Sequence, residues 1–315
     1  MSYVDLLPPE PGELFTMPMM DVSKITRKWL DVDYTPEMPH PSRKLDIYLP
    51  ETGDGPFPTL ICIHGGAFWG GDKRDFQTAA YMEAIPHGFA VVSVEQRLRR
   101  ALPEGGHDPE GVFPNPVFDY KAAIRYLRAN ASTYMLDPDK FASCGGSAGG
   151  YHAIIAAASA ANDVLYDKSL GYADISGEVQ AVVSWFGVGD LVLQSEFTSR
   201  TPVMHLPDGT TMPMANFADI FLGVNARENL NLAYFASPSA WITKSMPPTL
   251  IQSGAADAVV PIECSREIAV KIREICGEGR VEYDEFPDYA HGDERFSEES
   301  NINRMIAWLK QALQC

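Results

Sequence analysis

A glycine-rich hexapeptide at residues 145–150, GGSAGG, constrains this 315-residue chain more than any other feature. It follows the short apolar run 141–144 and precedes the alanine-rich stretch 148–161, which has a high helix propensity. A serine between glycines at a strand-to-helix junction is typical of a sharp turn that strains the backbone and exposes the hydroxyl group. The following helix directs its free N–H groups and its positive end towards that hydroxyl. The alternative is a glycine-rich turn without chemistry.

Strand-like and helix-like segments alternate from about residue 44 onwards. Strands are predicted where apolar residues alternate or run continuously, at residues 45–49, 59–63, 89–94, 141–144, 179–186, 249–253 and 281–286. Helices are predicted where the apolar spacing is helical, at residues 116–130, 148–161, 261–276 and 300–313. This alternation predicts an α/β fold with a mostly parallel, doubly wound sheet and helices on both faces.

Two segments fall outside the alternation. Residues 1–44 are rich in proline and methionine, and we expect an N-terminal arm that packs on the domain, because proline interrupts both helices and strand ladders. Residues 190–240 are too long for a plain connection, so we expect an insertion over the carboxyl edge of the sheet, where open α/β sheets bind ligands. The sequence therefore predicts one domain over residues 45–315 with a cap insertion at about 190–240.

A second glycine-rich motif, HGGAFWGG at residues 64–71, directly follows the predicted strand 59–63. Glycine allows backbone N–H groups to face a pocket, so the N–H groups of Gly66, Ala67 and Ala148 could hold a negatively charged oxygen. The alternative is a tight turn that only needs glycine torsions. His64 belongs to the turn itself and no second ligand stands at metal spacing, so we expect a buried structural histidine.

A nucleophilic serine needs a base, and the base needs a carboxylate that orients it. His291 follows the last predicted strand and Asp257 follows strand 249–253, which places both at the sheet edge where Ser147 stands. The order Ser147, Asp257, His291 is the order that this motif class expects. Taken singly, Asp257 could cap the next helix and His291 could be a loop residue. The other histidines are expected in loops, turns, the insertion or the helix after the serine, at positions 40, 64, 87, 107, 152 and 205.

These motifs resemble serine esterases and lipases of the α/β-hydrolase superfamily, in particular its bacterial acetyl- and feruloyl-esterase-like (BD-FAE-like) branch. The resemblance covers residues 44–313 and is carried by segments 45–50, 64–73, 119–131, 137–150, 184–191, 236–239, 247–261 and 291–309. It implies an α/β-hydrolase fold with an inserted cap or lid, and hydrolysis of carboxylic esters without a cofactor or metal. By this resemblance Ser147 is the nucleophile, Asp257 orients the base His291, and the oxyanion hole consists of Gly66, Ala67 and Ala148.

Several positions depart from the pattern of the branch and leave the ester open. Gly146 stands where many relatives have an acidic residue, Gln96 where they usually have a tyrosine, Ala67 in place of a third glycine, and Asp293 where they have an aromatic residue. None of these changes removes a catalytic role. The resemblance implies a small acyl (acetyl) or an aromatic (feruloyl-type) ester.

Aromatic residues near the two glycine motifs suggest the substrate pocket, namely Phe68, Trp69, Trp185 and Phe186. Apolar residues of the insertion and the arm could form a lid, namely Met204, Met212, Met214, Phe217 and Met17–Met20. The same residues could instead pack inside the insertion or form a contact between subunits of a homo-oligomer.

Two rival functions remain open, an amidase or peptidase with the same triad and a non-catalytic, hydrolase-like binding protein. The net charge of −17, from 25 Lys plus Arg against 42 Asp plus Glu, argues against nucleic acid and anionic lipid as partners. Five widely spaced cysteines without a CxxC pair suggest neither a disulfide framework nor a zinc site. We find no signal or membrane-spanning pattern, and we therefore expect a cytoplasmic protein that acts on a small-molecule ester.

Overall fold

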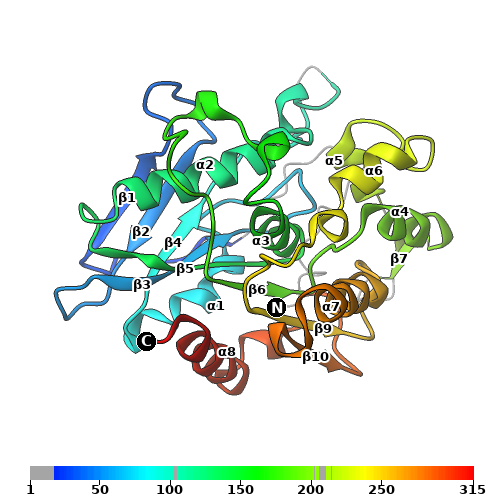
Figure 1. Ribbon diagram of the computed structural model, residues 1–315. Coiled ribbons are helices and arrows are strands. Elements are labelled where there is room, and N and C mark those ends of the chain that lie inside the picture. The colour runs from blue at the N-terminus through cyan, green and yellow to red at the C-terminus, as the bar shows by residue number, and fades with distance from the viewer. Residues whose placement is uncertain (1–17, 103–104, 202, 206–210, 214) are drawn as a thin grey trace.

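The computed structural model describes residues 18–102, 105–201, 203–205, 211–213 and 215–315. Within these residues, eight strands form one sheet in the order β1-β2-β4-β3-β5-β6-β9-β10 (Figure 1). Their bounds are β1 (Lys28–Asp33), β2 (Lys44–Tyr48), β3 (Phe57–Ile63), β4 (Ala90–Val94), β5 (Leu136–Gly146), β6 (Ala181–Trp185), β9 (Thr249–Gly254) and β10 (Val281–Phe286). β2 pairs antiparallel with β1 and β4, and the other neighbours in this sheet are parallel. The predicted mostly parallel sheet is confirmed.

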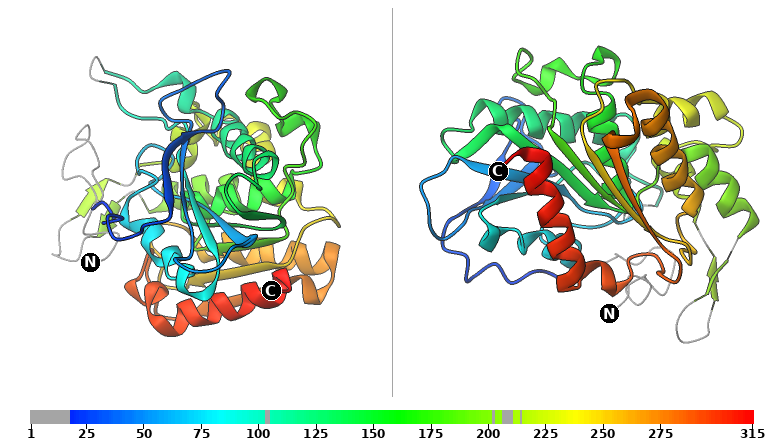
Figure 2. Two further views of the ribbon diagram at one scale, coloured as in Figure 1. Left: turned by 90° about the vertical axis from the view of Figure 1, so that its left-hand side faces the viewer. Right: turned by 60° about the horizontal axis from the view of Figure 1, so that its bottom comes forward.

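Helices cover both faces of the sheet, as predicted. α2 (Asn115–Ala129), α3 (Ala148–Ala158) and α7 (Ile262–Cys276) share one apolar core with it, and α1 (Ala79–Met82) and α8 (Glu299–Leu313) share a second. Figure 2 shows α2 and α3 on one side of the sheet and α8, in red, on the other. Side chains of β3 alternate between the cores because successive residues of a strand point to opposite faces: Ile61 and Ile63 face the first core, and Leu60 and Cys62 face the second.

The segment assigned to the N-terminal arm contributes a strand that the sequence analysis did not predict. β1 is the edge strand of the sheet and pairs Lys28 with Tyr48 and Asp33 with Lys44 of β2. No proline lies within residues 28–33, so the stretch can form a ladder although its surroundings are rich in proline. The boundary between arm and domain stays a prediction.

The predicted insertion forms a group of short elements, α4 (Leu191–Arg200), β7 (Val203–His205), β8 (Thr211–Pro213), α5 (Phe217–Leu222) and α6 (Leu230–Ala236). Phe221 of α5 is fully buried and stacks on Phe68 of the second glycine motif, with 4.2 Å between ring centroids. Met204 and Met212 fall in β7 and β8, and Met214 lies outside the described residues. A role of this segment as a lid stays a prediction.

Across the described residues, we find no helix that combines the length and the apolar character needed to cross a membrane.

Candidate active site

Ser147 occupies the turn between β5 and α3. Its backbone has a positive φ of 56° with ψ −123°, which residues other than glycine rarely adopt, and its N–H donates to the carbonyl oxygen of Trp185 at 3.0 Å. A Cβ at Gly145 would lie 2.4 Å from the carbonyl carbon of Gly149, and a Cβ at Gly149 would lie 2.2 Å from the oxygen of Ile63. The chain can therefore make this turn only with glycine at these positions, and the predicted strained turn is confirmed.

A continuous line of hydrogen bonds joins the three residues singled out at the carboxyl edge of the sheet. The Nε2 atom of His291 lies 2.9 Å from Oγ of Ser147, and its Nδ1 atom lies 2.7 Å from Oδ2 of Asp257. A carboxylate can only accept a hydrogen bond, so Nδ1 carries the proton and Nε2 is left to accept from the serine hydroxyl. The side chains of His291 and Asp257 are 1% and 3% exposed, so this line is shielded from water.

The Asp257 carboxylate performs two tasks. Its Oδ1 atom accepts hydrogen bonds from the N–H groups of Val259 and Val260, both at 2.8 Å, while Oδ2 faces His291. These two hydrogen bonds stabilise a turn ahead of α7, whose N-cap is Pro261, so Asp257 does not cap that helix and the alternative interpretation is wrong. The neighbouring N–H of Ala256 donates to the carbonyl oxygen of Tyr289 at 3.1 Å, which ties this loop to the loop that carries His291.

An arginine that the sequence analysis did not single out holds the loop of His291. The Arg295 guanidinium donates to Oδ2 of Asp288 at 2.8 Å and to both carboxylate oxygens of Asp293, also at 2.8 Å, and lies 3.9 Å above the Tyr289 ring. Residues on both sides of His291 are therefore joined through one side chain. Charged residues that lie so close together in sequence give no periodic signal. Only the nearness of Asp288, Asp293 and Arg295 in the sequence could have indicated these ion pairs.

The second glycine motif forms a turn against Ser147. Gly66 and Ala67 have positive φ angles of 109° and 54°, and a Cβ at Gly65 would lie 3.3 Å from Cβ of Ser147. Within the described chain, the N–H groups of Gly66 and Ala67 make no hydrogen bond. Ala148 is the first residue of α3, so its N–H has no partner inside the helix. Free N–H groups from two elements thus lie close to the serine.

A buried ion pair lies beneath this turn. Nε2 of His64 is 3.1 Å from Oε1 of Glu95, and Nδ1 of His64 is 2.7 Å from the carbonyl oxygen of Gly65. Burial opposes protonation of His64, but the negative charge of Glu95 outweighs it and raises the pKa of His64 from 6.5 to about 9. The predicted structural role of His64 agrees with this arrangement. Its partner Glu95 was missed, although it follows strand 89–94 at the same sheet edge.

Replacing Glu95 by glutamine should remove a contribution to stability that depends on pH. Since folding raises the pKa of His64, the ion pair stabilises fully below about pH 6.5, and this stabilisation is lost as the pH rises through about 9. A shift of this size corresponds to about 3 kcal/mol. Thermal unfolding should therefore show Glu95→Gln well below the parent protein at pH 6 and close to it at pH 10.

Comparing Glu95→Gln with the parent protein at each pH also removes the opposing effect of Lys121 on stability. Burial lowers the pKa of Lys121 to about 7, so stability from that group rises with pH between about 7 and 10.5. This trend is common to both proteins and cancels in the difference. A difference in unfolding temperature that stays constant from pH 6 to 10 would contradict a charged His64.

A small pocket lies beside the serine, and we call it the serine-side pocket. Its volume is about 60 Å³, and its wall includes the glycines that precede Ser147 and follow His291, Gly146 and Gly292. Aromatic and polar side chains complete the lining, among them Gln77, Tyr81, Trp185, Phe186 and Phe296. The predicted pocket residues Trp185 and Phe186 are thus part of it, whereas Gln77, Tyr81 and Phe296 come from segments without a local sequence signal.

The other residues predicted for the pocket or lid lie elsewhere. Phe68 is 2% exposed and packs between Tyr151 and Phe221, below the cap insertion. Trp69 is half-buried in the turn that follows. Met17 lies outside the described residues, and Met19 is exposed and bridges to Asp75. Their assignment to a substrate pocket or lid stays a prediction.

His152, the histidine nearest to Ser147 in sequence, cannot act as its base. It is fully buried in α3 among the rings of Phe68, Tyr120 and Tyr151. Neither ring nitrogen has a hydrogen-bond partner among the described residues. Burial lowers the pKa of His152 to about 3, so it stays neutral.

Comparisons with known proteins give one family model and several similar proteins. The BD-FAE family model matches residues 45–272, which is more than half of the chain. A probable carboxylic ester hydrolase, LipM of Mycobacterium tuberculosis, is 28% identical over 237 residues that cover 75% of this chain and 49% of LipM. Esterase LipQ of the same organism is 29% identical over 234 residues, covering 74% of this chain and 50% of LipQ. The chain thus spans about half the length of these curated relatives.

Solved structures share the fold. A truncated carbohydrate esterase from gut microbiota superposes with a TM-score of 0.75 at 24% identity, over 95% of this chain and all of that one. A bifunctional GH43-CE protein of Bacteroides eggerthii superposes with a TM-score of 0.73 at 26% identity, over 91% of this chain and 38% of the other. The predicted α/β-hydrolase fold is confirmed by these similarities together with the sheet order.

Proposed function

The chain belongs to the BD-FAE family, and on this premise we propose that it is a carboxylic ester hydrolase with Ser147, His291 and Asp257 as its catalytic triad. The observation that carries the proposal is the line of hydrogen bonds from Ser147 through His291 to Asp257, with distances of 2.9 and 2.7 Å. A nucleophile within reach of a base, and a base oriented by a buried carboxylate, is the arrangement that acyl transfer needs. The similar proteins LipM, a probable carboxylic ester hydrolase, and LipQ, an esterase, agree with it.

The reaction proceeds in two steps. His291 accepts the proton of the Ser147 hydroxyl at Nε2 while the serine oxygen attacks the ester carbonyl carbon. The negative charge on the former carbonyl oxygen is stabilised by the N–H groups of Gly66, Ala67 and Ala148, which act as the oxyanion hole. His291 then protonates the leaving alcohol, and a water molecule activated by the same imidazole hydrolyses the acyl-enzyme.

The serine-side pocket favours a small acyl group over a feruloyl group. Its volume of about 60 Å³ is far below the roughly 300–1,000 Å³ of pockets that enclose drug-sized ligands. Phe186 lines this pocket and packs on the His291 ring, with 4.9 Å between the two ring centroids. We therefore assign the acetyl group of the substrate to this pocket.

Phe186→Ala should extend the range of acyl groups. Removing the ring enlarges the serine-side pocket, so the ratio of kcat/KM for p-nitrophenyl butyrate to that for p-nitrophenyl acetate should rise about tenfold, the usual effect of a methylene or two in an apolar pocket. The same assay with a feruloyl ester extends the series. Phe235→Ala, on the exposed helix α6, is the matched control and should leave the ratio unchanged. A parent protein that prefers butyrate or feruloyl esters would contradict the assignment of an acetyl group.

Matched ester and amide substrates separate the proposed activity from its rivals. An esterase should hydrolyse p-nitrophenyl acetate and leave p-nitroacetanilide nearly untouched, because the amide has a stronger bond to a poorer leaving group. Comparable turnover of both would favour the amidase reading. The absence of turnover on either substrate, in a folded protein, would favour a binding protein.

A further inference from the structure

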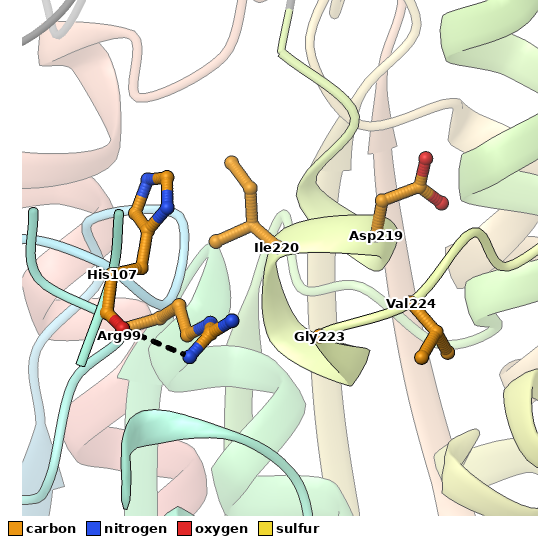
Figure 3. Close-up of a pocket in the computed structure, with 6 residues that line it drawn as sticks. All are labelled: Arg99, His107, Asp219, Ile220, Gly223 and Val224. Atoms are coloured by element: carbon orange, nitrogen blue, oxygen red, sulfur yellow. Dashed lines mark hydrogen bonds between the residues drawn. The ribbon is translucent and has the colours of Figure 1, made fainter. Parts of the chain in front are cut away.

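A second cavity opens between the loop that follows β4 and the cap insertion, and we call it the Arg99 pocket. It has a volume of about 280 Å³ and is lined by Arg99, His107, Asp219, Ile220, Gly223 and Val224 (Figure 3). Nothing in the proposed reaction so far uses it. Its wall combines a guanidinium group and an imidazole with two apolar side chains, a combination that suits a ligand with a charged end and an apolar body.

The Arg99 guanidinium is oriented but not neutralised. Its Nη1 atom donates to the carbonyl oxygens of His107 at 3.3 Å and Asp108 at 2.6 Å. In the part of the chain that the structure describes, Nε and Nη2 donate to no other group, and Arg99 forms no ion pair. These two nitrogens lie on one edge of the planar group, which is the edge that binds a carboxylate through two parallel hydrogen bonds.

The one carboxylate in the wall is engaged elsewhere. Oδ1 of Asp219 accepts a hydrogen bond from the N–H of Ala226 at 2.7 Å, and Figure 3 shows the carboxylate directed away from the guanidinium. Gly223 has a φ of 71°, and a Cβ there would lie 2.9 Å from Val112 and 3.7 Å from Nη2 of Arg99. The glycine therefore keeps space open next to the nitrogen that has no partner.

The pocket is joined to the proposed oxyanion hole by a short path. The N–H of Arg99 donates to the carbonyl oxygen of Phe68 at 2.9 Å, and Phe68 directly follows Ala67. On the other side, the Phe68 ring stacks on Phe221 in α5, next to the pocket residue Ile220. The guanidinium of the next residue, Arg100, donates to the carbonyl oxygen of Gly71 at 3.3 Å, so positive charge gathers along this side of the turn.

We propose that the Arg99 pocket binds a carboxylate on the alcohol portion of the ester substrate, with Ile220 and Val224 against the apolar body of that portion. The serine-side pocket takes the acyl group, and the Arg99 pocket is the second cavity tied to the oxyanion turn, through the hydrogen bond from the N–H of Arg99 to Phe68. A singly charged, planar carboxylate matches the free edge of Arg99, and it is repelled less by a chain of charge −17 than a doubly charged phosphate would be. This inference rests on the proposed ester hydrolysis.

The test compares acetate esters whose alcohol portion carries a carboxylate with the same esters carrying a neutral carboxamide. The substrates are the acetate esters of 4-hydroxybenzoate, 4-hydroxyphenylacetate and 3-(4-hydroxyphenyl)propanoate, each paired with its primary carboxamide, so that the charge stands at three distances from the ester. For the best-fitting length, the acid-to-amide ratio of kcat/KM should fall about tenfold in Arg99→Gln. Arg99→Lys, which keeps the charge and loses the flat fork, should give an intermediate ratio. Arg280→Gln, at the opposite end of the sheet before β10, should match the parent protein.

The outcomes separate this inference from the proposed function. An acid-to-amide ratio that is the same in Arg99→Gln and the parent at all three lengths would overturn the carboxylate site while leaving the esterase intact. If the parent protein hydrolyses neither the acetate esters that carry a carboxylate nor those that carry a carboxamide, the proposed function fails instead. In that case, calorimetric binding of free 4-hydroxyphenylacetate against its amide reads the pocket directly: tighter binding of the acid that Arg99→Gln abolishes supports the site, and equal binding overturns it.

Discussion

Replacing Ser147 by alanine should lower kcat/KM for p-nitrophenyl acetate by about 10⁴- to 10⁶-fold, because the acyl-enzyme cannot form without the serine oxygen. Any rate of hydrolysis that remains above the uncatalysed rate in water would come from the oxyanion turn alone. The fold should survive, since alanine meets the same backbone demands as serine at this positive φ and Ser147 is held in the turn through its N–H. Thermal unfolding should therefore stay within a few degrees of the parent protein.

Ser132→Ala provides the matched control for this substitution. Ser132 is exposed and lies in the turn between α2 and β5, at the end of β5 opposite to Ser147. Its variant should retain the activity of the parent protein. Ser147→Ala with more than a hundredth of that activity would mean that another residue attacks the ester.

Asp257→Asn should lower kcat by about 10⁴-fold with little change in KM. The asparagine oxygen can keep the hydrogen bonds from Val259 and Val260, so the loop should hold its shape. Its amide nitrogen would then face Nδ1 of His291 as a donor, which forces the ring proton onto Nε2. An imidazole with the proton on Nε2 cannot accept the proton of Ser147.

Steady-state kinetics on p-nitrophenyl acetate measure this effect, with Asp174→Asn on the exposed surface as the control for the same change of charge. A loss below tenfold in Asp257→Asn would remove Asp257 from the proposed triad. A loss seen mainly in KM would mean that the carboxylate positions the substrate instead of the imidazole.

How much of the structure could be predicted from the sequence depends on how far apart in the chain the residues that carry each signal lie. The turn at Ser147 is encoded within a few residues, because steric demands at Gly145 and Gly149 arise from their immediate neighbours. Asp257 and His291 lie far apart in sequence and were still proposed together. Asp257 lies four residues beyond the predicted strand 249–253 and His291 five residues beyond the predicted strand 281–286, and parallel strands end at one edge of the sheet.

The same rule could have indicated the pair of His64 and Glu95. β3 and β4 are parallel neighbours, His64 directly follows β3, and Glu95 directly follows β4. The charge of Glu95 gave no reason to choose it over other acidic residues, because a buried ion pair becomes visible only when both burial and distance are known. The hydrophobic pattern and the spacing of residues in the sequence give neither the burial of a side chain nor the distance between two side chains.

The edge strand β1 and the lining of the serine-side pocket were beyond the sequence for a different reason. β1 is short, half exposed and surrounded by prolines, so its pattern is weak. Tyr81 and Phe296 meet in one pocket although more than two hundred residues separate them in sequence, and the segments that carry them have no local motif. Such contacts depend on how the helices pack on the sheet, which hydrophobic periodicity does not determine.

The central claim is that Ser147 is a nucleophile activated by His291, and covalent labelling tests it most directly. The intact protein is treated with a fluorophosphonate, digested, and the modified peptide is located by mass spectrometry. Our account predicts one adduct, on Ser147, formed rapidly in the parent protein, at least about 10³-fold more slowly in His291→Ala, and absent in Ser147→Ala. A folded parent protein that carries no adduct, or carries it on another residue, would contradict the account.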